Sequence, residues 1–277
     1  MTDETPLGET PPGDAPSNAK LRLGGIALRN GLALFGPTSW AAAVRTSDGT
    51  ISVASGKRPR SQIADRVPLA RGVVRMSEMV VALPLIRRRL PDARLSFEHG
   101  SVAASALMCT ALAAVARRRG GFRGELASTV IGLVPSLVTL RSRDLVRYHG
   151  AEHKTVAGYE QGVDAATTSK EHERCGSHLV APLLLGTAGA AALTARTPAR
   201  WRRPVAALGS LGSIGIAFEL FAWRERHPES LGARALAGPG FALQRALATA
   251  EPGAAELEVA DCALEALLAA EAAGAAA

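Results

Sequence analysis

Four apolar stretches dominate the pattern of hydrophobic and polar positions along the chain. They are residues 101–116, 126–140, 179–195 and 204–223, of which only the last contains a charged residue, Glu219. A membrane-spanning helix needs about 20 apolar residues, with a range of roughly 17 to 25. The last two stretches are therefore long enough to span a bilayer, and the first two are short.

Arginine-rich segments at residues 117–123 and 196–203 join the stretches in pairs, as in helical hairpins that cross a bilayer. This pattern predicts a mainly α-helical, polytopic membrane protein with about four spans. Two spans, or a soluble Ala-rich helical bundle, are the alternatives.

The residues before the first apolar stretch follow a different pattern. From Gly24 to about Ser55 the pattern is typical of strands, and Ser47-Asp48-Gly49 separates residues 40–44 from residues 51–53. Glycine tolerates the positive φ of a tight turn, so this pattern predicts a β-hairpin. So small a sheet must pack on other elements to be stable.

Residues 68–90 are apolar on one face and carry Arg at their ends. They predict an amphipathic helix along the membrane surface, broken near Pro84. An ordinary core helix is the alternative.

The first 20 residues are rich in Pro, Gly, Thr and acidic side chains, which predicts a disordered tail. They contain no basic segment followed by an apolar one, so we expect no cleaved signal peptide. These patterns divide the chain into six segments. They are the tail (1–20), a small α+β region with the amphipathic helix (21–94), two membrane helices (95–140), a histidine-containing loop and helix (141–177), two further membrane helices (178–224) and a helical C-terminal region (225–277).

The charge of the chain fits a membrane protein better than a nucleic-acid-binding protein. Lys and Arg total 32 against 25 Asp and Glu, a net charge of +7, but only 4% of the residues are aromatic. Single-strand binders need aromatic rings beside their basic groups. The arginines instead cluster next to apolar stretches, as in Arg87-Arg88-Arg89. We therefore expect the lipid bilayer as a partner and no nucleic acid.

The Lys and Arg distribution also predicts an orientation. With four spans, both termini and residues 141–177 share one side, which carries more Lys and Arg than the two short linkers opposite. By the positive-inside rule this shared side is the cytoplasmic side of the cell membrane. The three scattered cysteines, Cys109, Cys175 and Cys262, agree with a reducing compartment.

The candidate chemistry lies in the middle of the chain. His149-x-x-Glu152-His153 places two imidazoles one helical turn apart, with an acid between them on the same face. We expect this helix over residues 144–161, with Asp144 as N-cap and Gly162 as its stop. Two neutral imidazoles at this spacing can bind Zn²⁺, and the carboxylate can take a proton from metal-bound water, as in the inverted zincin motif. A polar helix face with hydrogen-bonded histidines is the alternative.

Three other features surround this motif. Gly150 and Gly158 destabilise a helix by up to about 1 kcal/mol each relative to Ala, so we expect another backbone or a ligand to approach there. His172 and Cys175 can complete a tetrahedral site, or the thiol can act as a nucleophile activated by its basic neighbours. For Cys175 a small buried residue in a turn is the alternative. The remaining two cysteines are expected to be packing residues.

The motifs RYHGAEHK, YE-x-G and H-x-RCG together resemble the YqhQ-like family, bacterial membrane proteins of unknown function that are described as predicted metal-dependent enzymes. The resemblance extends over about residues 22–270 and includes Gly24-Gly25, Phe218-Glu219 and the run from Pro239 to Gln244. Two motifs differ from the family pattern. The opening reads GGIALRNGLALFG in place of GGQAVIEGVMMRG, and the last reads ATAEP in place of TTREP. The resemblance thus implies a metal site more firmly than a named activity.

Our first hypothesis is a membrane-embedded zinc hydrolase with His149 and His153 as ligands and Glu152 as general base. Cys175 or His172 would lie in or next to the ligand shell. The second is a non-enzymatic membrane scaffold or accessory protein with a structural metal or none. The third is a transporter or channel, which the absence of an internal repeat argues against. The pattern identifies neither the substrate nor the oligomeric state, and a homo-oligomer stays open.

Glu219 is a candidate for a further metal ligand. Inverted zincins take their third ligand from a downstream glutamate, and Glu219 follows His153 by 66 residues and matches a Tyr-Glu pair of the family. We expect its carboxylate to point at the two histidines. Pairing with Arg224 or Arg226 is the alternative.

Overall fold

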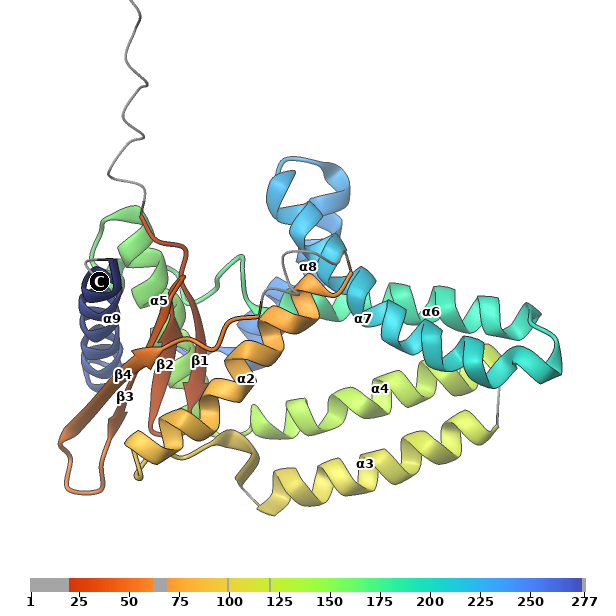
Figure 1. Cartoon of the computed structure of the whole chain (residues 1–277), viewed down its shortest axis with the longest axis horizontal. Coiled ribbons are helices and arrows are strands. Elements are labelled where there is room, and N and C mark those ends of the chain that lie inside the picture. Colours follow the sequence, from red (N-terminus) through yellow and green to blue (C-terminus); the bar gives the residue numbers. More distant parts are fainter. Residues whose placement is uncertain (1–19, 62–68, 99, 120, 276–277) are drawn as a thin grey trace, which may run out of the picture.

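The N-terminal part of the chain forms a small antiparallel sheet, and the rest is mainly helical (Figure 1). This computed structural model describes residues 20–61, 69–98, 100–119 and 121–275. It confirms the mainly α-helical fold with a β-hairpin-containing N-terminal region. Apart from Lys20, the tail expected at residues 1–20 lies outside the described residues. Two parts are visible in Figure 1, a body built around the sheet and a group of long helices that extends from it.

The sheet contains four strands in sequence order, each antiparallel to the next. They are β1 (Gly24–Leu28), β2 (Gly31–Phe35), β3 (Ser39–Arg45) and β4 (Ile51–Lys57). The predicted hairpin joins β3 and β4, where Gly49 has a φ of 89° and Asp48 accepts a hydrogen bond from the Thr50 backbone N–H at 3.2 Å. The turn chemistry therefore agrees with the prediction.

The two faces of the sheet pack against different helices. Because side chains alternate along a strand, Leu32 and Leu34 lie on one face, while Ala33 and Phe35 lie on the other. The first face is covered by α5 (Arg143–Gln161) and α9 (Ala254–Ala275), and the second by α2 (Arg71–Arg89). The helix with the histidine motif is thus fixed against the sheet.

Helix α2 runs without interruption through Pro84, so the expected break at this residue was wrong. Proline removes the hydrogen bond to the carbonyl four residues earlier, here that of Val80. Val80 is 53% exposed, so the helix tolerates the loss at its surface. The opposite side of α2 buries Ala82 and Ile86 against the sheet.

Four long helices form two antiparallel hairpins next to the body (Figure 1). They are α3 (Gly100–Arg118), α4 (Gly121–Thr139), α6 (Val180–Arg196) and α7 (Arg202–Arg226). Helix α3 packs on α4, α4 on α6, and α6 on α7. Large apolar side chains remain exposed along them, including Leu107, Met108, Leu185, Leu193, Leu208 and Leu211. This apolar surface is what lipid-facing helices present.

Three helical segments in the described part of the chain are long and apolar enough to cross a membrane, by length and composition. They are Gly100–Arg118, Gly176–Arg196 and Ala199–Arg226. The fourth stretch that we expected to span lies in α4, whose first turns carry Arg123 and Glu125 and lower its mean hydropathy.

Helix α5 begins and ends close to the expected residues. Its N-cap is Ser142, whose hydroxyl accepts a hydrogen bond from the Leu145 backbone N–H, so the expected cap at Asp144 was wrong. Asp144 lies in the first turn instead, where a negative charge is also favourable. Gly162 ends the helix in the left-handed conformation, with a φ of 74°, as predicted.

After the long helices the chain returns to the body. Helix α8 (Leu231–Leu243) continues into a π-helical turn, Gln244–Ala248, and an extended segment then leads to α9. In the part of the chain that the structure describes, four short 3₁₀ helices connect other elements. They are η1 (Ser96–Glu98), η2 (Ala165–Thr167), η3 (Gly176–Leu179) and η4 (Ala199–Trp201).

Candidate metal centre

Three side chains from two segments converge next to the sheet. His149 and His153 lie one turn apart on α5, with ring centroids 4.4 Å from each other. Cys175, which directly precedes η3, brings its Sγ to 3.5 Å from Nε2 of His149. The ligand atoms of these three residues all lie within 4.8 Å of one another. We call this group the His/Cys cluster.

Two backbone carbonyls fix the orientation of the histidine rings. Nδ1 of His149 lies 2.8 Å from the Ala248 oxygen, and Nδ1 of His153 lies 2.6 Å from the Lys170 oxygen. A carbonyl can only accept a hydrogen bond, so Nδ1 must carry the proton in both rings. In the neutral imidazole Nε2 then keeps its lone pair, the form in which histidine binds a metal.

Glu152 lies beside the cluster on the same helix face. Its Oε2 is 3.9 Å from Nε2 of His149, and the residue is buried. Burial raises the pKa of this carboxyl, and the neighbouring His149 opposes the shift only partly. Gly25 on β1 makes room for the carboxylate, because a Cβ at this position would lie 2.5 Å from Oε1 of Glu152.

The segment that follows the π-helical turn crosses α5 at Gly150. The Ala250 backbone N–H donates to the Val146 carbonyl at 2.9 Å, and a Cβ on Gly150 would lie 2.1 Å from the Ala250 oxygen. The expectation that another backbone approaches this glycine is confirmed. Ala248, the last residue of the π-helical turn and directly before this segment, supplies the carbonyl that holds His149.

His172 lies next to the cluster but outside it. Its ring centroid is 5.6 Å from that of His153, its Nδ1 accepts a hydrogen bond from the Arg174 backbone N–H at 3.2 Å, and its Nε2 lies 3.6 Å from Glu160. Burial, followed by the positive fields of His153 and Arg174, lowers the pKa of His172 to about 4. Both ring nitrogens therefore face partners other than the cluster, and the ring is neutral at pH 7.

Glu219 is held at a different place. Its carboxylate on α7 accepts hydrogen bonds from the Arg71 guanidinium and from the Leu69 backbone N–H, at 2.8 Å from Nε of Arg71. It pairs with neither Arg224 nor Arg226, the partners considered from the sequence, and it does not belong to the His/Cys cluster. Arg71 lies 148 residues away in the chain, so no local pattern indicated this pair.

The part of the chain that carries the cluster matches a known protein family. A model of a protein family of unknown function, DUF1385, matches residues 129–270. The chain belongs to the DUF1385 family. No curated protein and no solved structure matches it significantly. The DUF1385 match contains every residue of the His/Cys cluster and Glu152, whereas Gly25, which accommodates Glu152, precedes it.

Gln244 is a site residue of this DUF1385 protein that reasoning from the sequence missed. Its side chain is fully buried, its Oε1 accepts from the His172 backbone N–H at 2.8 Å, and its Nε2 lies 3.2 Å from the His172 carbonyl and 2.9 Å from the Ser177 hydroxyl. These contacts tie the loop of Cys175 to the C-terminal region. Only the Pro239–Gln244 run in the family resemblance pointed to this residue.

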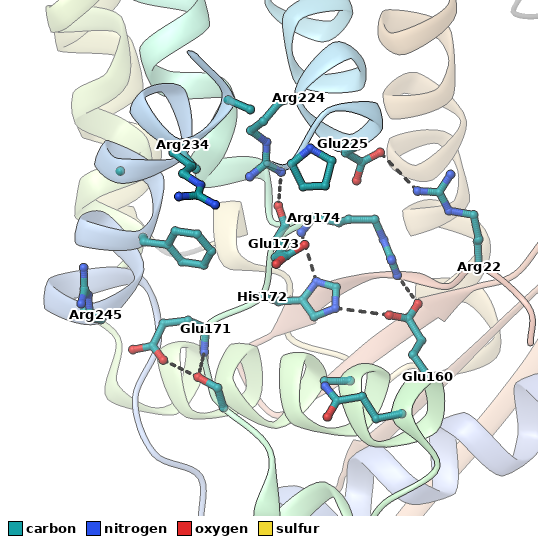
Figure 2. Close-up of a pocket in the computed structure, with 18 residues that line it drawn as sticks. Arg22, Glu160, Glu171, His172, Glu173, Arg174, Arg224, Glu225, Arg234 and Arg245 are labelled. Carbon is teal, nitrogen blue, oxygen red and sulfur yellow. Dashed lines mark hydrogen bonds and ion pairs between the residues drawn. The ribbon is translucent and has the colours of Figure 1, made fainter. Parts of the chain in front are cut away.

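A cavity of about 940 Å³ opens beside His172 in the DUF1385 protein, and none of the three residues of the His/Cys cluster lines it (Figure 2). It lies between α5, the end of α7, α8 and the loop that carries His172, and both His172 and Ala157 line it. Figure 2 shows several arginine and glutamate side chains pointing into this space, from α7 and α8 on one side and from α5 on the other.

Proposed function

We propose that this DUF1385 protein binds one divalent metal ion, preferably zinc, through His149, His153 and Cys175, and that it is a membrane-embedded hydrolase. The carrying observation is the pair of backbone carbonyls that hold Nδ1 of both histidines, together with ligand atoms of His149, His153 and Cys175 that all lie within 4.8 Å of one another. Such contacts are the usual means by which proteins orient metal-binding histidines.

The spacing of the donor atoms fits zinc. Zinc binds nitrogen at about 2.0–2.1 Å and thiolate sulfur at about 2.3 Å, so a nitrogen and a sulfur on one tetrahedral zinc lie about 3.5 Å apart. The separation between Nε2 of His149 and Sγ of Cys175 is 3.5 Å. A thiolate with two imidazoles is also a donor set that suits zinc better than magnesium or calcium. Three protein ligands leave one position for water, as in catalytic zinc sites.

Glu152 is proposed as the general base. When bound, zinc would lower the pKa of a coordinated water and make it a nucleophile at neutral pH. Glu152 lies on the same face of α5 as both histidines and can accept the proton of a water at the cluster. Burial raises the pKa of this carboxyl above its ordinary value, so it holds a proton more readily than an exposed glutamate does.

The packing of the body limits how many of the long helices can cross a membrane. Helix α5 packs on β1 and β2, so the segments before and after α3 and α4 lie on the same side of any membrane. The number of crossings between them must then be even, and α4 would cross if α3 does. The same holds for α6 and α7, because α9, which follows them, also packs on α5 and the sheet. This favours four spans.

The proposed orientation places the sheet, α5 and α9 in the cytoplasm. The tips of the two helical hairpins carry four arginines each, in residues 117–123 and 196–203. The remaining Lys and Arg near the spans lie on the side of the body and outnumber them, which the positive-inside rule associates with the cytoplasm.

A non-enzymatic scaffold with a structural metal is the second candidate. The observation that favours it is the burial of Glu152 at 3.9 Å from Nε2 of His149, close enough for a small shift to make it a fourth ligand. Structural zinc sites have four protein ligands, and catalytic ones keep a position for water.

Elemental analysis of the full chain purified in detergent tests the proposal. We expect close to one equivalent of zinc per chain, and a fall to background in His149→Ala and His153→Ala. Glu152→Gln is expected to retain the metal if this residue is a base and to lose affinity if it is a ligand. His227→Ala, at the exposed end of α7, is the matched control and should leave the metal content unchanged. Wild-type protein with no metal above the background of His149→Ala would refute the metal site.

A further inference from the structure

The cavity beside the His/Cys cluster is rich in arginine. The five that line it are Arg22, Arg174, Arg224, Arg234 and Arg245. Two of them are paired with carboxylates of the cavity wall, since Arg174 contacts Glu160 and Arg22 lies 3.2 Å from Glu225. Glu173 and Glu225 also line the cavity and lie close enough to act on the charge of Arg224. In the described part of the chain, no carboxylate of the cavity wall pairs with Arg234 or Arg245.

Arg234 and Arg245 are available to a ligand. Arg234 pairs with Glu229, but both side chains are largely exposed, at 63% and 86%, and exposed pairs of this kind contribute little. Within the described part of the chain Arg245 has no hydrogen-bond or ion-pair partner. Figure 2 shows Arg245 at the edge of the cavity and Arg234 entering it from the side of α8.

Arg224 is a buried guanidinium whose N–H groups do not all have a hydrogen-bond acceptor. It is 6% exposed, and one of its terminal nitrogens donates to the Glu173 carbonyl, but its Nε has no hydrogen-bond partner. Buried donors are nearly always satisfied in folded proteins. Because this Nε is inaccessible, a ligand in the cavity would meet Arg224 at its terminal nitrogens. Figure 2 shows the Arg224 and Arg234 side chains on the part of the cavity wall that α7 and α8 form.

The position of these arginines narrows the ligand chemistry. Guanidinium groups match the oxygens of phosphate in a two-pronged arrangement, and three of them suit a dianion. Arg224 lies near the end of α7, a segment apolar enough to cross a membrane, and Phe241 of α8 adds an apolar wall. The cavity therefore lies where a lipid headgroup or a soluble phosphorylated molecule could enter.

We propose that this cavity binds a phosphate-bearing anion through Arg224, Arg234 and Arg245. The bound phosphate lies next to His172, whose ring is 5.6 Å from that of His153. The site is separate from the metal ligands, because its arginines belong to α7, α8 and the π-helical turn, whereas the ligands belong to α5 and the loop before η3. It can therefore be tested in the absence of metal.

The experiment measures ligand binding to the full chain in detergent after treatment with a chelator. Two probes distinguish the sources of phosphate, dihexanoyl phosphatidic acid for a lipid headgroup and glycerol 3-phosphate for a soluble molecule. We expect at least one probe to bind, and Arg234→Gln with Arg245→Gln to weaken it at least about tenfold, or about 1.4 kcal/mol. Both positions are exposed, so the double variant is expected to fold.

The matched control is Arg202→Gln with Arg203→Gln, which removes the same charge at the other end of α7. Binding of the lipid probe alone supports the site and assigns it to a headgroup, and binding of both probes supports recognition of the phosphate itself. Binding of neither probe, or an equal loss in both double variants, would overturn the inference without affecting the metal site.

Discussion

Which ring nitrogen of His149 and of His153 can bind a metal depends on backbone atoms that no sequence pattern reveals. His149 and His153 were recognisable by their spacing, but the carbonyls of Ala248 and Lys170 determine which ring nitrogen is free. Every residue has a carbonyl, so only the folded chain shows which of them is used. The same limit applies to Gly25, whose role follows from the position of Glu152 against β1.

Two aspartates are expected to make opposite contributions to the pH dependence of stability. Burial raises the pKa of Asp261 above its ordinary value of 3.8, so the native state holds this proton more tightly than the unfolded state. Stability is then lost as pH rises through the interval above 3.8. Hydrogen bonds from Thr46 and Thr50 lower the pKa of Asp48, which contributes stability that is lost as pH falls through its ordinary value.

Thermal unfolding of Asp261→Asn and Asp48→Asn, at about pH 3.5 and about pH 7, tests the direction of the pKa shift of each aspartate. The melting temperature of Asp261→Asn, relative to that of the wild type, should be higher at about pH 7 than at about pH 3.5. That of Asp48→Asn should be lower at about pH 7 than at about pH 3.5. Shifts of the same sign in the two variants would contradict the assigned environments.

At the scale of elements, the sequence was most informative where one local signal determined the outcome. The β-hairpin was predicted from its Gly49 turn, and the end of α5 from Gly162. Pro84 gave a wrong prediction because its effect depends on whether the carbonyl four residues earlier is exposed. The cap of α5 was misplaced by two residues because Ser142 and Asp144 are both good N-cap residues.

The contact between α5 and the segment after the π-helical turn can be tested at Gly150. In Gly150→Ala the new Cβ would meet the Ala250 carbonyl, and backbone must shift to relieve the overlap. We expect a loss of about 1–3 kcal/mol in the free energy of unfolding, typical of overpacking, together with weaker metal binding because the Ala248 carbonyl moves. Calorimetry and zinc titration measure the two effects.

Gly132→Ala on α4 is the control for this substitution, since a Cβ there meets nothing within 4 Å. It should leave zinc binding unchanged and should not lower the free energy of unfolding, because Ala favours a helix over Gly by up to about 1 kcal/mol. A Gly150→Ala protein as stable and as zinc-bound as Gly132→Ala would show that the segment does not support the cluster.

On the scale of the whole molecule, the body and the hairpin tips lie at opposite ends of the long helices (Figure 1). The apolar stretches indicated these helices from the sequence. The sequence alone predicted about four spans, with two as the alternative. Under the proposed membrane location, the packing of α5 and α9 on the same sheet favours the four, and this packing is visible only in the folded chain. Contacts such as that of Arg71 with Glu219, which joins α2 to α7, likewise appear only in the folded chain.

Labelling of single introduced cysteines tests this arrangement. Val163→Cys lies in the exposed loop after α5, and Ala199→Cys lies at the exposed tip between α6 and α7. A membrane-impermeant maleimide added to intact cells should label Ala199→Cys, and it should label Val163→Cys only after permeabilisation. The wild type, whose Cys109 and Cys175 are buried, gives the background. The reverse pattern would contradict the orientation, and equal labelling from one side would contradict the crossing of α6 or α7.

The most direct test of the central claim is X-ray absorption spectroscopy at the zinc edge of the purified protein. The proposed site predicts one sulfur at about 2.3 Å and two imidazole nitrogens at about 2.0–2.1 Å. Cys175→Ser should remove the sulfur signal, and Cys262→Ser should leave it unchanged. A spectrum without sulfur, or with sulfur that persists in Cys175→Ser, would contradict metal binding by His149, His153 and Cys175.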